Sequence, residues 1–200
     1  MSDTRVYLEE GPRWVFAAAL DWPGWCRRGR GELDAIDTLT DYAERYAAVA
    51  GAGFSPGRIE VVGRLKGNST TDFGAPDVIG PWDEELLTEA ETSRMVDLLE
   101  ESWRYFDATA AAAPAGLRKG PRGGGRDRDA VAQHVREAER HYTAKLGVRI
   151  LPRTPWPEQR VMVADAIRFC APSSPWPVRY AIRRYAWHVL DHAWEIEDKS

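Results

Sequence analysis

The sequence predicts an α+β fold in which a small sheet-containing unit precedes a bundle of four helices. Three observations support this prediction: apolar residues alternate at period two near the amino terminus, they recur at helical spacing after residue 81, and prolines separate the later helical segments. We therefore expect two domains, 1–80 and 81–200, each long enough to bury a core of its own.

The first domain is predicted to be a β-β-α-β unit. Its strands are rich in branched and aromatic residues, and a Pro-Gly pair ends the second of them. Glycines follow the helix and stop it. In chain order, the expected elements are a strand at residues 6–8, a strand at 14–20, a helix at 32–50, a strand at 59–65 and a loop at 67–76.

The second domain is predicted to contain four helices joined by proline-rich connections, which is typical of a bundle. The first begins at Thr88, where Glu91 three residues later completes a capping-box pattern, and it ends before Pro114. The other three are expected from residue 127 or 129 to 146, from 158 to 169 and from 178 to 197.

Composition and charge exclude several classes of protein. A net charge of −4 argues against the whole surface being a nucleic-acid footprint, which is normally basic, and leaves a local basic patch open. The two cysteines lie far apart in the sequence and give no disulfide framework, which favours a reducing compartment. The amino terminus carries no apolar stretch like that of a signal peptide, and the longest apolar run, 14–20, is too short to cross a bilayer. We expect a cytoplasmic protein with neither a nucleic acid nor a membrane as partner.

All four histidines lie in the predicted helical half, and three of them suggest a metal site. His188 and His192 are four residues apart, so a helix places both rings on one face, with Cβ atoms about 5–6 Å apart. His134 lies on the apolar side of the second helix. Three imidazoles with coordination positions left open are typical of a catalytic metal site. Asp191 and Glu195 are candidates to orient an imidazole through its second nitrogen. From spacing alone, a satisfied polar patch remains the alternative.

No residue pair identifies an acid–base couple. His141 lies two turns beyond His134 on the same helix, and we treat it as a pocket residue, not a ligand. Together with Glu137 and Tyr142, it is the nearest candidate for proton transfer.

A basic, glycine-rich loop precedes the second helix. Its arginines lie before a helix amino terminus, where the helix dipole favours anions, so Arg122, Arg126 and Arg128 are candidates to bind a carboxylate or phosphate of a substrate. The loop lacks the residue order of a P-loop, so nucleotide hydrolysis is not implied. A solvated inter-helix loop is the alternative interpretation.

The histidine pattern also resembles a known family. His134 on the second helix, followed by His188-x-x-x-His192 on the fourth, is similar to the DinB/YfiT-like family of four-helix metal-binding proteins, and residues 184–195 resemble its last-helix motif. The resemblance covers about residues 82–200. It implies a divalent metal, zinc or nickel, held by the three histidines, and a transferase or isomerase activity that uses a low-molecular-weight thiol such as mycothiol or bacillithiol. Residues 15–26, with their Pro-Gly turn, resemble the HicB-like antitoxin fold.

Two functional hypotheses follow, and a third remains as a baseline. The first is a divalent-metal-dependent enzyme acting on a small-molecule substrate, with a thiol-dependent transferase or isomerase favoured over a hydrolase. The alternative is a non-catalytic metal- or ligand-binding regulatory protein whose amino-terminal unit recruits a partner. The baseline is a four-helix scaffold with incidental histidines. The sequence leaves the oligomeric state open, a homodimer included.

Overall fold

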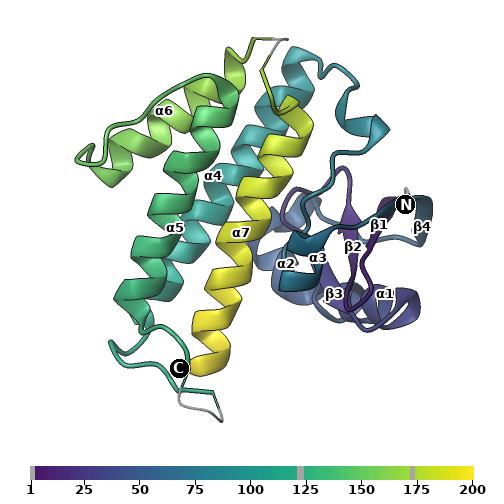
Figure 1. Cartoon of the computed structure of the whole chain (residues 1–200), viewed down its shortest axis with the longest axis horizontal. Helices are drawn as coiled ribbons and strands as arrows, with labels where there is room; N and C mark the ends of the chain where they lie inside the picture. Colours follow the sequence, from purple (N-terminus) through teal and green to yellow (C-terminus); the bar gives the residue numbers. More distant parts are fainter. Residues whose placement is uncertain (1–2, 121–123, 172–173) are drawn as a thin grey trace. The chain divides into compact units, whose positions relative to one another are not determined.

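A computed structural model describes residues 3–120, 124–171 and 174–200 of the chain. The chain divides into two compact units, Met1–Leu86 and Leu87–Ser200. The first contains a four-stranded sheet, and the second is built from long helices (Figure 1). The protein therefore has a mixed α+β fold.

The first unit is built around a sheet with the strand order β3-β2-β1-β4. The β1–β2 and β2–β3 pairs are antiparallel, whereas β4 pairs with β1 in parallel after a helical connection. Every residue of β2 is buried. The elements are β1 (Thr4–Glu10), β2 (Val15–Ala19), β3 (Cys26–Gly29), α1 (Glu32–Asp41), α2 (Ala43–Ala50), β4 (Ile59–Lys66) and α3 (Ser69–Phe73), with 3₁₀ turns at Gly51–Gly53 and Pro81–Asp83.

The predicted β-β-α-β order of this unit is wrong in three places. The strand β3 is additional, and the expected helix at 32–50 breaks at Tyr42 into α1 and α2. The expected loop at 67–76 contains α3, whose first turn is capped by the Asn68 side chain, which accepts hydrogen bonds from the backbone amides of Thr70 and Thr71 at 2.8 and 3.3 Å. At the end of β3, a Cβ atom on Gly29 would lie only 2.3 Å from the backbone nitrogen of Ala35, so the close approach of β3 to α1 requires glycine.

The second unit contains the four predicted helices: α4 (Glu89–Ala112), α5 (Arg128–Thr143), α6 (Trp156–Arg168) and α7 (Val178–Lys199), with a 3₁₀ turn, η3 (Ala144–Leu146), after α5. The predicted capping box is confirmed, because Glu91 N–H donates to Thr88 Oγ1 at 3.2 Å and Thr88 N–H donates to Glu91 Oε2 at 2.8 Å.

The helix α7 is the most extensively buried helix of the second unit. It packs against α4, α5 and α6, and every residue from 180 to 190 is buried. Figure 1 shows α7 in yellow beside α5 in green. Side chains on the α5-facing side of α7 are therefore enclosed by protein.

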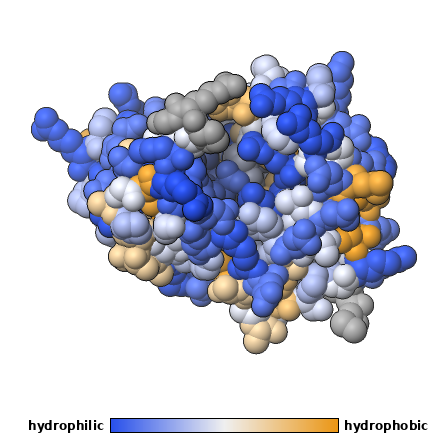
Figure 2. Space-filling model, turned by 90° about the horizontal axis from the view of Figure 1, so that it is seen from below, coloured by the Kyte–Doolittle hydropathy of each residue, from blue (hydrophilic) through white to orange (hydrophobic). Residues whose placement is uncertain are grey.

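The described helices include none with both the length and the apolar character needed to cross a membrane. The face of the molecule seen in Figure 2 is mostly hydrophilic, and its hydrophobic areas are small and separated by polar residues.

Candidate metal centre

The three predicted metal ligands converge where α5 packs on α7. His134 lies in the second turn of α5, and His188 and His192 lie one turn apart on α7. One nitrogen of each ring lies within 4.8 Å of the corresponding nitrogen of the other two. The ring centroids are separated by 4.7 Å for the pair on α7 and by 5.1 and 5.0 Å from these to His134. The sequence prediction that these three residues lie together is confirmed.

The measured spacing matches that of two ligands on one ion. Nε2 of His134 and Nε2 of His188 are 3.2 Å apart. Two nitrogens bound at 2.0–2.1 Å in tetrahedral geometry lie about 3.3 Å from each other. A direct N–H···N hydrogen bond would give a similar distance for this pair, but it would not account for the third ring. The group contains no carboxylate or thiolate ligand among the described residues, so three nitrogens would leave a coordination position open.

Burial keeps the rings in the form that binds metal. The pKa of His188 is well below its usual value of 6.5, first because the side chain is buried and then because His192 and His134 lie beside it. The pKa of His134 is also lowered, first by burial and then by the nearby His192 and Arg126. Both imidazoles are therefore neutral at physiological pH, with a lone pair available. Nδ1 of His188 is buried without a hydrogen-bond partner in the described part of the chain, and an unsatisfied buried polar atom often marks a functional site.

A carboxylate orients His192. It belongs to Glu195, one of the two acidic residues that the sequence predicted as candidates for this role. Nδ1 of His192 lies 2.7 Å from Oε2 of Glu195, and Oε1 of the same carboxylate accepts from Lys199 Nζ at 2.5 Å. The hydrogen bond from His192 is the largest of the effects that lower the pKa of Glu195 from 4.5 to about 2, so the carboxylate stays ionised. With a carboxylate on Nδ1, that nitrogen carries the ring proton, and Nε2 is left free for an ion. Sequence reasoning missed Lys199, although its i,i+4 spacing from Glu195 was a usable signal.

The candidates for proton transfer lie at different distances from the centre. The Tyr142 ring meets His188 edge to face, with centroids 5.7 Å apart. Glu137 is exposed and accepts a hydrogen bond from Gln133 at 2.7 Å, yet it is near enough to His134 to oppose the lowering of that pKa. His141 lines a separate pocket, described below.

The basic loop contributes one arginine to the surroundings of the centre. Arg126 is exposed, and its charge is among the causes that lower the pKa of His134 and His188. Arg128 instead donates to Asp129 at 2.8 Å and to the Ala113 carbonyl at 2.9 Å, so it ties the loop to the end of α4. Arg122 lies outside the described residues.

A buried arginine, Arg184, lies against two aromatic rings that neighbour His188. The sequence did not indicate it as a site residue. The guanidinium carbon of Arg184 lies 4.8 Å from the centroid of the Trp187 ring and 5.4 Å from that of Tyr142. Its positive charge is a further cause of the low pKa of His188. The arrangement favours a neutral His188 and an anionic ligand nearby.

Comparisons of this chain with family models, with curated proteins and with solved structures find no match.

Proposed function

We propose that the protein is a divalent-metal-dependent enzyme of the DinB/YfiT-like type, with the metal held by His134, His188 and His192. The observation that carries this proposal is the convergence of one nitrogen from each ring within 4.8 Å, without a fourth protein ligand among the described residues. The helix order and the placement of the ligands on the second and last helices of the bundle also support it.

The surrounding residues fit the needs of such a centre. Glu195 fixes the orientation of His192, and burial keeps His188 neutral. Once bound, the ion would act as a Lewis acid that polarises a substrate atom or lowers the pKa of a thiol or water. Of the three candidates for proton transfer, Tyr142 is the one whose ring contacts a ligand, so it is the preferred one.

The three nitrogen ligands narrow the choice of metal, and the positive charges nearby narrow the class of substrate. Neutral imidazole nitrogens suit zinc and nickel, whereas magnesium and calcium prefer oxygen ligands. The positive charges of Arg184 and Arg126 favour an anionic substrate or co-substrate, as a thiolate would be. We therefore propose a zinc- or nickel-dependent transferase or isomerase that acts on a small molecule with the help of a low-molecular-weight thiol.

A turnover assay tests this function. Metal-loaded protein is incubated with a panel of electrophiles and several thiols, alongside the His188→Ala variant and, as a control, Glu158→Ala on the exposed face of α6. We expect thiol-dependent turnover in the wild type and the control, and background turnover in His188→Ala. Unchanged turnover in His188→Ala would refute the metal-dependent mechanism. Metal binding without turnover for any thiol would instead favour a regulatory, metal-sensing protein.

A further inference from the structure

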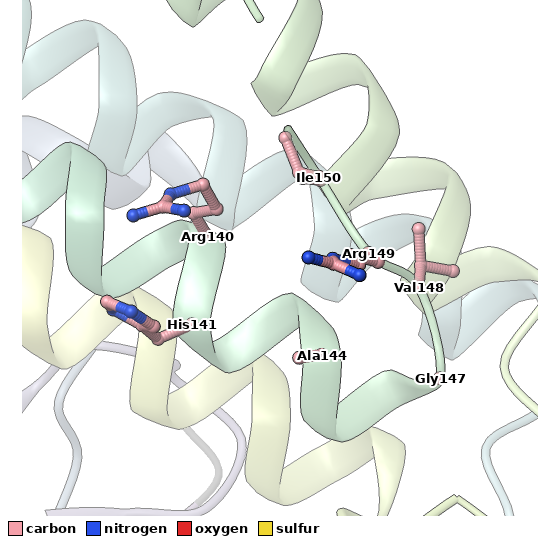
Figure 3. Close-up of a pocket in the computed structure, with 7 residues that line it drawn as sticks. All are labelled: Arg140, His141, Ala144, Gly147, Val148, Arg149 and Ile150. Carbon is pink, nitrogen blue, oxygen red and sulfur yellow. The ribbon is translucent and has the colours of Figure 1, made fainter. Parts of the chain in front are cut away.

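A second basic pocket lies at the carboxyl-terminal end of α5. The chain passes from α5 through η3, turns at Gly147 with φ of +82°, and runs back past the helix. The turn and the last residues of α5 enclose a cavity of about 290 Å³. Figure 3 shows Arg140 and His141 projecting from α5, and Arg149 extending from the loop back toward that helix. Ala144, Val148 and Ile150 provide the apolar part of the lining.

The three basic side chains of this pocket have no partner among the described residues. Arg140, His141 and Arg149 form no hydrogen bond or ion pair with any residue in the described part of the chain. Other arginines on the helices of the same unit are paired with a carboxylate, as Arg104, Arg160, Arg168 and Arg179 are.

The segment around the pocket also carries only positive charges. Residues 140–153 contain four lysines and arginines and no aspartate or glutamate, within a chain whose net charge is −4. The helix dipole accounts for basic residues in the last turn of α5, because cations are favourable at a helix carboxyl terminus. It does not account for Arg149, which lies beyond the helix and is nevertheless directed toward α5.

We propose that this pocket binds a small oxyanion, the carboxylate or phosphate group of a metabolite, between Arg140 and Arg149. Guanidinium groups donate paired hydrogen bonds to both kinds of oxyanion, and His141 adds a further donor. The apolar side chains of Ala144, Val148 and Ile150 contact the carbon portion of the ligand. His141 is seven residues beyond His134, about 10 Å along the helix axis, so the pocket is separate from the metal centre. The inference does not depend on the proposed enzymatic function.

Amide-resolved NMR titration tests the site directly. Inorganic phosphate and butyrate are titrated at constant ionic strength into the wild type, the Arg140→Ala/Arg149→Ala double variant and the Arg153→Ala control. Arg153 is an exposed arginine of the same basic segment that does not line the pocket. We expect saturable shifts of the Gly147 and Arg149 amides in the wild type and the control, and at least a tenfold weaker affinity in the double variant.

The two probes show which oxyanion the pocket prefers. A phosphate site is saturated by inorganic phosphate, and a carboxylate site is saturated by butyrate. The titration is repeated in His188→Ala, where the same shifts are expected because the pocket does not require the metal ligands. The proposal is overturned if neither probe produces saturable shifts at the pocket, if the double variant binds as tightly as the control, or if the shifts vanish in His188→Ala.

Discussion

Replacing Glu195 with glutamine is expected to weaken metal binding at least tenfold. Glu195 contacts no ion itself, but its carboxylate lies 2.7 Å from His192 Nδ1 and holds the ring proton on that nitrogen. The pKa of Glu195 falls from 4.5 to about 2, with the hydrogen bond from His192 as the largest cause and Lys199 as a further one, so the carboxylate that accepts from His192 is ionised. A hydrogen bond to a charged group is worth roughly 1.5–3 kcal/mol, and the loss of about 1.5 kcal/mol corresponds to about tenfold in affinity. This agrees with the roughly 10–100-fold losses typical of residues that orient metal ligands.

The affinity is measured by competition with a chromophoric chelator at pH 7. Glu197→Gln is the matched control, because Glu197 is on the same helix and its carboxylate accepts a hydrogen bond from the Tyr105 hydroxyl at 2.5 Å, away from the three histidines. We expect Glu197→Gln to remain within about twofold of the wild type. An equal affinity for Glu195→Gln and the wild type would show that the carboxylate does not orient a ligand.

Three further predictions concern stability. In metal-free protein, the free energy of unfolding should fall as the pH drops below 6.5, because unfolded histidines take up protons while the lowered pKa keeps His188 neutral in the folded state. Urea unfolding at two pH values should show a smaller change of this free energy with pH for His188→Asn than for the wild type. An equal change in the two proteins would contradict this cause. Glu139→Ala should cost about 2 kcal/mol, because this 1% exposed carboxylate accepts from Trp156 Nε1 at 2.7 Å and removing it leaves that indole donor without its acceptor, while Arg160 keeps its ion pair with Asp107 at 2.6 Å. A loss below about 1 kcal/mol in urea unfolding would show that the contact is dispensable. Gly29→Ala should destabilise the first unit by about 1–3 kcal/mol, since its Cβ would overlap the α1 backbone at Ala35, and an unchanged unfolding midpoint would argue against that close approach.

The helices of the second unit were predictable because their signals are local. The Thr88 capping box and the prolines before α6 and α7 mark helix starts that the structure reproduces to within a few residues. The strand β3 carries no such signal, since Arg27 and Arg28 at its centre interrupt any apolar alternation. It forms because the Pro-Gly turn returns the chain along β2, which is a tertiary effect.

The metal centre was predictable only in part. Helical spacing places His188 and His192 on one face, but the register between α5 and α7, which brings His134 to within 3.2 Å of His188, depends on core packing that no local pattern encodes. The role of Glu195 followed from its distance along the helix. The role of Arg184 required the structure, because its neighbours are defined by side-chain direction, whereas the i,i+4 spacing of Lys199 from Glu195 could have indicated their pairing.

The binding of one divalent ion by three imidazole nitrogens is tested most directly by the metal content of the purified protein combined with X-ray absorption spectroscopy. We expect about one zinc or nickel per chain, with nitrogen neighbours at roughly 2.0–2.1 Å. Alanine at His134, His188 or His192 should each reduce the metal content to background, whereas His141→Ala should retain it. A wild-type protein that stays metal-free after exposure to both ions, or an absorption spectrum without nitrogen ligands, would contradict the account.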